Sequence, residues 1–295
     1  MAMSASVRVG FIGTGGIAMN KHLPKLAELE PVELVALCDV SEERVTTATQ
    51  CFGGRPYTDY REMLDREELD ALFICVPPFA HGDIELRALE RGLHLFIEKP
   101  VVLDMDVGIA ILEAVRKANV LTSVGYSRRY SPIVNAVREL LSTQTIAMVT
   151  ANRWGGIVMA TDWWRQVDKS GGRLVENATH EVDLMRYWVG DVICVYARYA
   201  QRTISDVPGA TIPDAEVVAM EFSNGAVGYI STCSALTKGG GWYDVRVVIK
   251  DAMIHFTGRD VYIIPQGALE LPPIGEAMDI TVAFVEAIRQ NDHHL

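Results

Sequence analysis

The stretch VGFIGTGGIAMNKHL, residues 9–23, joins an apolar run to a helical pattern through a glycine-rich turn. It contains Gly13-x-Gly15-x-x-Ala18, the spacing of a dinucleotide-binding loop when a strand precedes it and a helix follows. The first glycine permits the tight turn, the second lets the backbone approach a pyrophosphate, and the alanine is small enough for helix–strand contact. The loop residues expected to contact the cofactor are Gly13, Thr14, Gly15, Gly16 and Ile17. A glycine-rich turn in a domain without a dinucleotide is the alternative.

An acidic residue completes this fingerprint at the end of the next apolar run. VELVALCDV, residues 32–40, places Asp39 about 20 residues past the loop, where a carboxylate can accept hydrogen bonds from ribose hydroxyls. Because an aspartate there repels a 2'-phosphate, the sequence favours NAD. Arg44 could soften that preference, so NADP is the alternative cofactor.

The first 125 residues alternate apolar runs with helical patterns. Runs of Val, Ile and Leu without polar alternation indicate strands that are buried on both faces, as in a parallel sheet built from βαβ units. The expected strands are 7–12, 32–38, 71–76, 93–97 and 120–124, and the expected helices are about 16–29, 42–51, 80–91 and 104–118. We therefore predict an α/β Rossmann dinucleotide-binding domain over residues 1–125.

The alternation of apolar runs with helical patterns ends after residue 125. Helices are expected from Pro132 and over about 178–189 and 277–290. Strands with polar alternation and hairpin signals such as Asn224-Gly225 are expected over 146–153, 193–200, 215–222, 226–233, 243–250, 252–257 and 260–264. The prediction is an α+β domain with an open, mainly antiparallel sheet over residues 126–295.

Composition narrows the classes of partner. The net charge of -11 argues against nucleic acid, whose phosphates need basic surfaces. No run approaches the roughly 18 apolar residues of a membrane span, and the first ten residues lack an apolar signal core. The five cysteines are scattered and never spaced C-x-x-C, so we expect a reduced, cytoplasmic protein without a metal site.

Two segments place candidate functional residues at the carboxyl edge of the predicted parallel sheet, where such folds bind ligands. In FICVPPFAH, residues 73–81, Val76 and Pro77 end a strand and His81 begins the next helix. We expect all three residues to contact the cofactor. In LHLFIEKPVVLD, residues 93–104, Glu98 and Lys99 end the following strand and are also expected to contact the cofactor. A salt bridge within the loop is the alternative for Glu98. A lysine beside a nicotinamide can stabilise charge that develops on a substrate oxygen.

A polar stripe is predicted in SGGRLVENATHEVDLMRYWVGD, residues 170–191. Glu176, His180, Asp183 and Tyr187 share one face if this segment is helical. Histidine suits a general base for an alcohol, and a carboxylate one turn away can fix its tautomer. A solvated face is the alternative interpretation.

The motifs together resemble the glucose–fructose oxidoreductase / inositol dehydrogenase (Gfo/Idh/MocA) family. The matching segments, in family order, are GFIGTGGIA, LCDVSEER, ICVPPFAH, FIEKP, VGYSRRYSP and GGRLVENATHEVDL. The resemblance implies NAD(P)-dependent oxidation or reduction of sugars, polyols and related compounds. It also implies a homodimer or homotetramer formed through the sheet of the second domain.

The resemblance also implies residue roles. Lys99 is then the catalytic lysine and His180 the proton-transferring histidine, facing each other across the domain cleft, with Glu176 where the family usually has Asp. Asp183, Arg128, Asn177 and Tyr126 are the expected substrate-binding residues, and Trp164 and Arg165 are expected to approach the nicotinamide.

Departures from the family pattern keep the substrate open. Glu176 is one methylene longer than the usual Asp, and Ala178 stands where a glycine is common. The chain also stops where family members usually continue, which suggests a truncated or a short member. Two further functions stay open: a non-catalytic regulator that binds NAD and a sugar, and a glycosidase that recycles NAD.

Overall fold

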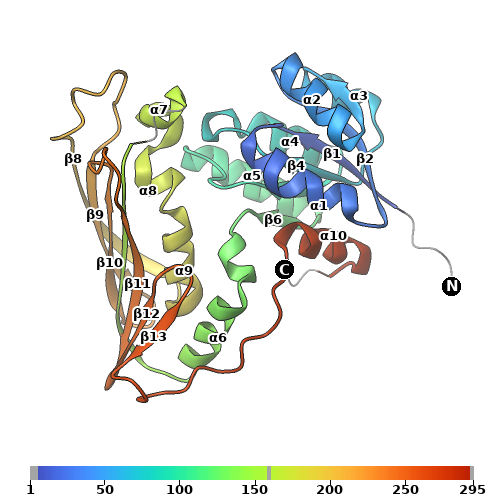
Figure 1. Cartoon of the computed structure of the whole chain (residues 1–295). Helices are drawn as coiled ribbons and strands as arrows, with labels where there is room; N and C mark the ends of the chain where they lie inside the picture. The colour runs from blue at the N-terminus through green and yellow to red at the C-terminus, as the bar shows by residue number, and fades with distance from the viewer. Residues whose placement is uncertain (1–5, 158–160, 293–295) are drawn as a thin grey trace. The chain divides into compact units, whose positions relative to one another are not determined.

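A computed structural model describes residues 6–157 and 161–292, which form two compact units (Figure 1). The first unit combines residues 6–125 with residues 278–292, and the second comprises Tyr126–Ala277. The expected assignment of residues 278–295 to the second domain is therefore wrong for the described part of that segment. Its helix α10 (Ile280–Gln290) packs on the first unit, where Phe284 contacts the rings of Phe73 and Phe96.

The sheet of the first unit is wholly parallel and has six strands in the order β3-β2-β1-β4-β5-β6. Its strands are β1 (Val7–Ile12), β2 (Val32–Cys38), β3 (Arg55–Tyr57), β4 (Ala71–Ile74), β5 (His94–Ile97) and β6 (Thr122–Val124). This order reverses at β1 and β4, which is the arrangement of a Rossmann fold with its ligand crevice at the carboxyl ends of those strands. The predicted fold class of the first domain is confirmed.

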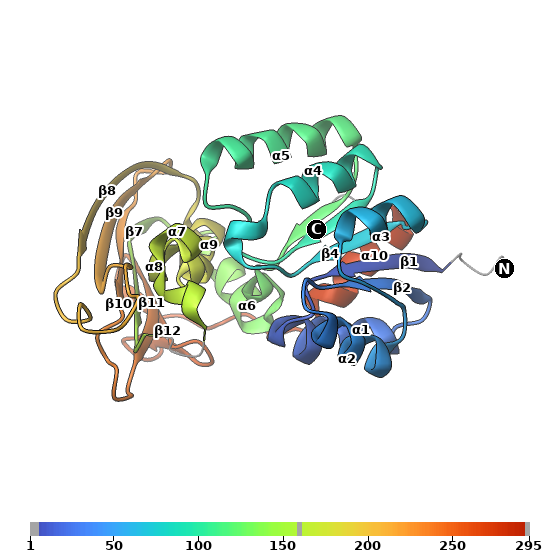
Figure 2. The ribbon, with the colours of Figure 1, turned by 90° about the horizontal axis from the view of Figure 1, so that it is seen from above.

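Helices cover both faces of this sheet. Besides α10, they are the π-helix η1 (Ala18–His22), α1 (Leu23–Glu28), α2 (Glu42–Phe52), α3 (Tyr60–Arg66), α4 (Asp83–Glu90) and α5 (Met105–Ala118), with a 3₁₀ turn η2 (Pro78–Ala80). Figure 2 shows α1 and α2 on one side of the sheet and α4 and α5 on the other. The sequence analysis missed β3 and α3. Strand β3 is difficult to predict because it is an edge strand of only three residues and contains Pro56.

The second unit is built on a seven-stranded sheet in the order β13-β12-β11-β7-β10-β9-β8. All neighbours are antiparallel except β7 and β10, as expected for a mainly antiparallel sheet. The strands are β7 (Ile146–Trp154), β8 (Val192–Ala200), β9 (Ala215–Phe222), β10 (Val227–Cys233), β11 (Trp242–Ile249), β12 (Ala252–Phe256) and β13 (Val261–Ile264). The short helices of this unit are η3 (Ser127–Tyr130), η4 (Asp162–Arg165), α7 (Val167–Ser170) and α8 (Gly172–Glu176), and the longer ones are α6 (Pro132–Leu141) and α9 (Thr179–Val189).

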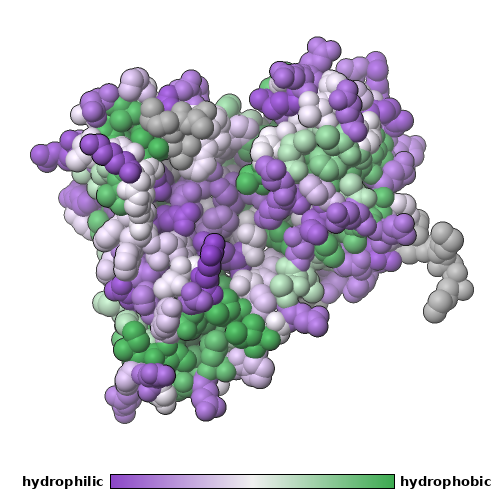
Figure 3. Space-filling model, viewed as in Figure 1, coloured by the Kyte–Doolittle hydropathy of each residue, from purple (hydrophilic) through white to green (hydrophobic). Residues whose placement is uncertain are grey.

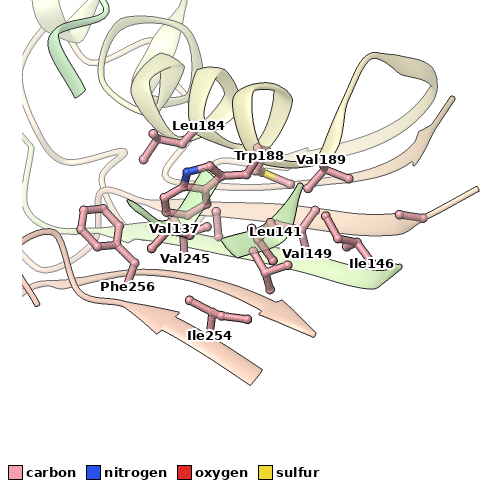
Figure 4. Packing of buried hydrophobic residues seen from close by; sticks show 14 of the residues in the cluster. Val137, Leu141, Ile146, Val149, Leu184, Trp188, Val189, Val245, Ile254 and Phe256 are labelled. Atoms are coloured by element: carbon pink, nitrogen blue, oxygen red, sulfur yellow. The ribbon is translucent and has the colours of Figure 1, made fainter. Parts of the chain in front are cut away.

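The core of the second unit lies between one face of the sheet and helices α6 and α9. Figure 4 shows Trp188 of α9 among Val137 of α6, Val245 of β11 and Phe256 of β12. The indole Nε1 of Trp188 donates to the Val134 carbonyl at 3.0 Å, which satisfies its polar atom inside the apolar core. The packing fixes α9, and with it the segment that carries His180.

The opposite face of the sheet, which we call the outer face, is not covered by any described helix. Paired residues form rows across all seven strands, and the exposed apolar side chains of two of these rows are Tyr196, Tyr229, Tyr262, Met148, Val227 and Ile264. Further apolar surface is visible at the lower end of this unit, where Figure 1 places β13 and α6 (Figure 3).

Candidate functional site

The glycine loop between β1 and η1 has the geometry of a phosphate cradle. Gly13 has φ +90°, and a Cβ atom there would lie 2.3 Å from the Cys75 carbonyl oxygen, so only glycine fits. A Cβ on Gly15, in contrast, would meet no described atom within 4 Å. Ala18 is buried against the sheet. The loop therefore leaves open space at the position where the sequence predicts a pyrophosphate.

The Asp39 carboxylate at the end of β2 is tied to this loop. One oxygen accepts the backbone N–H of Thr14 at 2.9 Å, and the other accepts the Ser41 N–H and the Arg44 guanidinium at 2.7–3.1 Å. Burial opposes ionisation, but the Arg44, Ser41 and Thr14 hydrogen bonds outweigh it and lower the pKa of Asp39. Since these bonds use nearly all acceptor positions, a ribose hydroxyl would have to replace the half-exposed Arg44.

The segment after β4 brings His81 to the same carboxyl edge. Val76 and Pro77 follow the strand, with Pro77 in an extended conformation, and the 3₁₀ turn η2 then leads to His81. The imidazole Nδ1 lies 2.5 Å from Glu85 on α4, whose other oxygen accepts the Gly82 N–H. His81 does not begin helix α4, which starts at Asp83; the carboxylate of Glu85 instead holds its ring.

Glu98 and Lys99 follow directly after β5, where a buried hydrogen-bond chain holds them. The backbone N–H of Lys99 donates to Glu98 at 3.0 Å, and the other Glu98 oxygen lies 3.1 Å from His22 Nε2. His22 Nδ1 lies 2.7 Å from Thr281 Oγ1, so the chain runs from η1 to α10. Lys21 adds a second cation 3.8 Å from Glu98. The sequence analysis missed His22 and Thr281, because 259 positions separate them.

The predicted polar stripe of the second unit is not one continuous helix. Glu176 is the last residue of α8, and Asn177 and Ala178 intervene before α9 begins at Thr179. His180 therefore lies in the first turn of α9, half-buried, and Glu176 is buried on a separate helix. The expectation that Glu176 lies one turn from His180 on the same helix is wrong.

Asp183 has a protein partner that the stripe did not predict. Arg129 binds its carboxylate through two guanidinium nitrogens, with Nε at 2.9 and 3.0 Å and Nη2 at 2.5 Å. Tyr187, one turn further on, donates to Asn135 of α6 at 2.9 Å. Both stripe positions thus bind neighbouring elements and do not form the solvated face that was the alternative.

A third group of polar residues surrounds Glu181, which the sequence analysis did not single out. Glu181 is completely buried, and no described residue donates a hydrogen bond of good geometry to its carboxylate, although the nearby Tyr243 hydroxyl favours its ionised form. Burial raises the pKa of Glu181, against the opposing effects of Arg153 and Arg128. Arg128 Nη2 lies 3.9 Å from it, and Arg153 Nε donates to Asn177 Oδ1 at 2.5 Å. Arg128 and Asn177, both predicted to bind substrate, therefore belong to one cluster.

The remaining predicted residues also lie in the second unit. The Tyr126 hydroxyl is 3.5 Å from Thr179 Oγ1 at the start of α9. Trp164 packs against Trp163 with ring centres 5.4 Å apart, and Arg165 pairs with Asp162. Among residues 6–157 and 161–292, no group of three His, Cys, Asp or Glu side chains could hold a metal ion. Within the same residues, every helix is too short or too polar to cross a membrane.

Comparisons with known proteins agree with this architecture. Residues 7–126 match the domain described as "Oxidoreductase family, NAD-binding Rossmann fold" of Gfo/Idh/MocA proteins, and residues 138–250 match "Oxidoreductase family, C-terminal alpha/beta domain". The uncharacterized oxidoreductase YrbE of Bacillus subtilis is 28% identical over 84% of this chain and 72% of its own length. Myo-inositol 2-dehydrogenase of Thermotoga maritima is 26% identical over 82% of this chain and 72% of its own length.

A solved structure supports the fold alone. The WlbA dehydrogenase from Bordetella pertussis, in complex with NADH and UDP-GlcNAcA, superimposes with a TM-score of 0.81 at 23% identity. The match covers 97% of this chain and 84% of that protein.

Proposed function

The chain belongs to the Gfo/Idh/MocA oxidoreductase family, and from that premise we propose that it is an NAD-dependent dehydrogenase or reductase of sugars, polyols or related compounds. One observation carries the proposal: an open glycine loop and a lysine lie at the carboxyl edge of one NAD-binding Rossmann sheet. The relatives include a myo-inositol 2-dehydrogenase, which favours a secondary alcohol or the corresponding ketone as substrate.

The first unit fits the cofactor. Gly13, Gly15 and the amides that follow would hold the pyrophosphate, and Asp39 would accept ribose hydroxyls once Arg44 moves. A carboxylate at this position repels a 2'-phosphate, so NAD is the preferred form and NADP the weaker one. When bound, the nicotinamide accepts or donates the hydride of the reaction.

The chain's own residues would handle the proton. In the oxidation direction, His180 takes the hydroxyl proton while the carbinol C–H bond gives its hydride, leaving a ketone. Lys99 stabilises the negative charge that develops on the oxygen, and Glu176 orients the substrate. Reduction runs through the same groups in reverse.

The test is a screen of sugars, polyols and their keto forms with NAD(H) and NADP(H), read by cofactor absorbance. Lys99→Ala and His180→Ala should each lower kcat by about 10²–10⁴-fold, the range for lost acid–base catalysis. Lys25→Ala, an exposed lysine of α1, is the control and should retain full activity. Turnover that survives both active-site substitutions would refute the assignment.

The screen also separates the other functions. A regulator would bind NAD and a sugar without any change in absorbance, and a glycosidase would release product without net NADH.

We also propose that the protein self-associates through the outer face of its second sheet. Exposed apolar side chains from β7, β8, β10 and β13 gather there, and such a surface usually becomes buried in an interface.

A further inference from the structure

Two arginines from different elements of the second unit stack on the same tyrosine. The guanidinium carbons of Arg128 on η3 and Arg153 on β7 lie 4.6 and 5.1 Å from the Tyr243 ring centre. Arg153 and Tyr243 are directly opposite each other in the β7–β11 register. Arg128 also lies 6.0 Å from the ring of Phe256. These aromatic faces orient both guanidinium groups without using their N–H donors.

Most of those donors remain available. Within the described residues, the Arg153 side chain has one hydrogen-bond acceptor, Asn177 Oδ1, and the Arg128 side chain has none. The nearest described carboxylate oxygen to Arg128 belongs to Glu181, at 3.9 Å, which is too far for a hydrogen bond. About a quarter of the Arg128 side chain is exposed. A guanidinium has five N–H donors, so the pair can still bind an incoming acceptor.

The local electrostatics favour an anion. Two guanidinium groups face one carboxylate, Glu181, whose burial works against its ionised form. Burial lowers the pKa of a third guanidinium, Arg173, and the nearby charge of Arg153 lowers it further, against the opposing effect of Glu216. Helix α9 begins at Thr179, and its preceding residue, Ala178, has no side chain to cap the first amides. The first turn of α9 contains Glu181 itself, so the positive end of the helix dipole acts on this same carboxylate.

We propose that Arg128, Arg153 and Tyr243 form a subsite for an anionic group of the substrate, either a carboxylate or a phosphate. The inference rests on the proposed function, because it names the substrate class of that site. It predicts a sugar acid or a sugar phosphate in preference to a neutral sugar. The competing explanation is that the arginines only neutralise Glu181. Arg128 lies within ion-pair distance of it, at 3.9 Å, but neither arginine makes a hydrogen bond with it, so their N–H donors are not used by this carboxylate.

The first experiment compares matched substrates on the full-length protein with saturating NAD. D-glucuronate and D-glucose 6-phosphate are the anionic probes, and D-glucose is their neutral partner. At least one anion should show kcat/KM about tenfold to a hundredfold above that of glucose, the gain expected from charge-assisted hydrogen bonds. The two probes distinguish the carboxylate source from the phosphate source. Equal or better turnover of glucose would overturn the inference.

Substitutions test whether the preference for anionic substrates depends on the two arginines. Arg128→Gln should reduce the ratio of anionic to neutral kcat/KM by about tenfold, and Arg128→Lys should restore only part of it, because lysine lacks the planar fork. Arg153→Lys keeps a positive charge beside buried Glu181 and tests the second arginine without leaving that acid alone. Arg138→Gln is the matched control: this arginine also stacks on a tyrosine, Tyr187, at 4.2 Å, but outside the cluster. A ratio that is unchanged in both Arg128 variants would overturn the inference.

Binding separates this inference from the proposed function. Isothermal titration of the protein with D-glucuronate and D-glucose 6-phosphate, at two salt concentrations, requires no turnover. Binding that weakens with salt and with Arg128→Gln supports the subsite even if no substrate is oxidised, in which case the proposed function fails alone. Failure of both anions to bind overturns the subsite.

Discussion

Among single residues, Asp39 and Arg44 are the pair that we propose to set the cofactor preference of the first unit. Asp39 holds the loop through Thr14 and Ser41, whereas Arg44 is about half-exposed and can move away. The carboxylate therefore holds the loop, and the proposed role in cofactor choice would come in addition to that structural role.

Replacing Asp39 by Asn should weaken the discrimination between NAD and NADP by about tenfold or more, since one charge repulsion is worth more than 1.4 kcal/mol at short range. The measurement is kcat/KM for both cofactors. Arg44→Ala should act in the opposite direction, because it removes the cation that could pair with a 2'-phosphate. Identical cofactor ratios in both variants would exclude this role for the pair.

Glu98 is a second residue whose charge matters to the fold. Burial favours its neutral form, but the His22 hydrogen bond and the charges of Lys21, His22 and Lys99 hold the pKa of Glu98 below its ordinary value. A lowered carboxyl pKa adds stability above the ordinary value of about 4.3, and that contribution disappears as the pH falls through the folded-state pKa.

Glu98→Gln should therefore lower the free energy of unfolding at pH 7 and have a smaller effect at pH 3.5. Urea unfolding of both proteins at the two pH values gives the difference. An effect that is equal at both pH values would show that shape, and not charge, accounts for the loss.

At the scale of elements, helix α9 is held by an ion pair to η3. Asp183 is 5% exposed and Arg129 is partly exposed, so loss of the arginine leaves a nearly buried carboxylate without its partner. We expect Arg129→Met to cost about 1–3 kcal/mol of unfolding free energy, after allowance for solvent around the arginine.

Asp183→Asn combined with Arg129→Met should recover part of that loss, as a double-mutant cycle by urea unfolding would show. The same variants test the predicted role of Asp183 in substrate binding. If Asp183 binds substrate, Asp183→Asn should raise KM more than Arg129→Met does; equal changes indicate that Asp183 only positions α9.

Helix α10 shows a similar dependence on distant partners. Phe284 is fully buried and contacts Phe73 of β4 and Phe96 of β5 edge-on. Phe284→Ala should cost about 3–5 kcal/mol, the range for a large buried aromatic residue. Phe79→Ala, at a half-exposed phenylalanine, is the comparison in the same thermal or urea unfolding assay. A cost below about 1 kcal/mol would show that α10 does not stabilise the first unit.

For the molecule as a whole, the outer face of the second sheet is a regular surface of exposed apolar side chains that no described helix covers. Tyr229 lies on β10, near the centre of that sheet, between residues of β7 and β9. Tyr229→Glu should shift the protein toward the monomer in sedimentation analysis, because it places a charge in the proposed interface. Ile109→Glu, at an exposed position on α5 of the first unit, should leave the oligomeric state unchanged. A wild-type protein that stays monomeric at high concentration would refute self-association.

Local sequence patterns predicted most of the elements and their order, although they missed β3 and α3. Apolar runs, the glycine loop and hairpin signals are local patterns, so they located β1, β2 and β9 without error and placed Asp39 and Lys99 at strand ends. Which residues Asp39, Lys99 and the other predicted site residues contact became known only from the tertiary structure. In the structure the expected stripe is interrupted after Glu176, and Asp183 forms an ion pair with Arg129. Helix α10 belongs to the first unit, and Arg153 stacks on Tyr243, 90 positions away in the sequence. These contacts form because segments that are distant in the sequence pack against each other, so the spacing of residues within one segment cannot predict them.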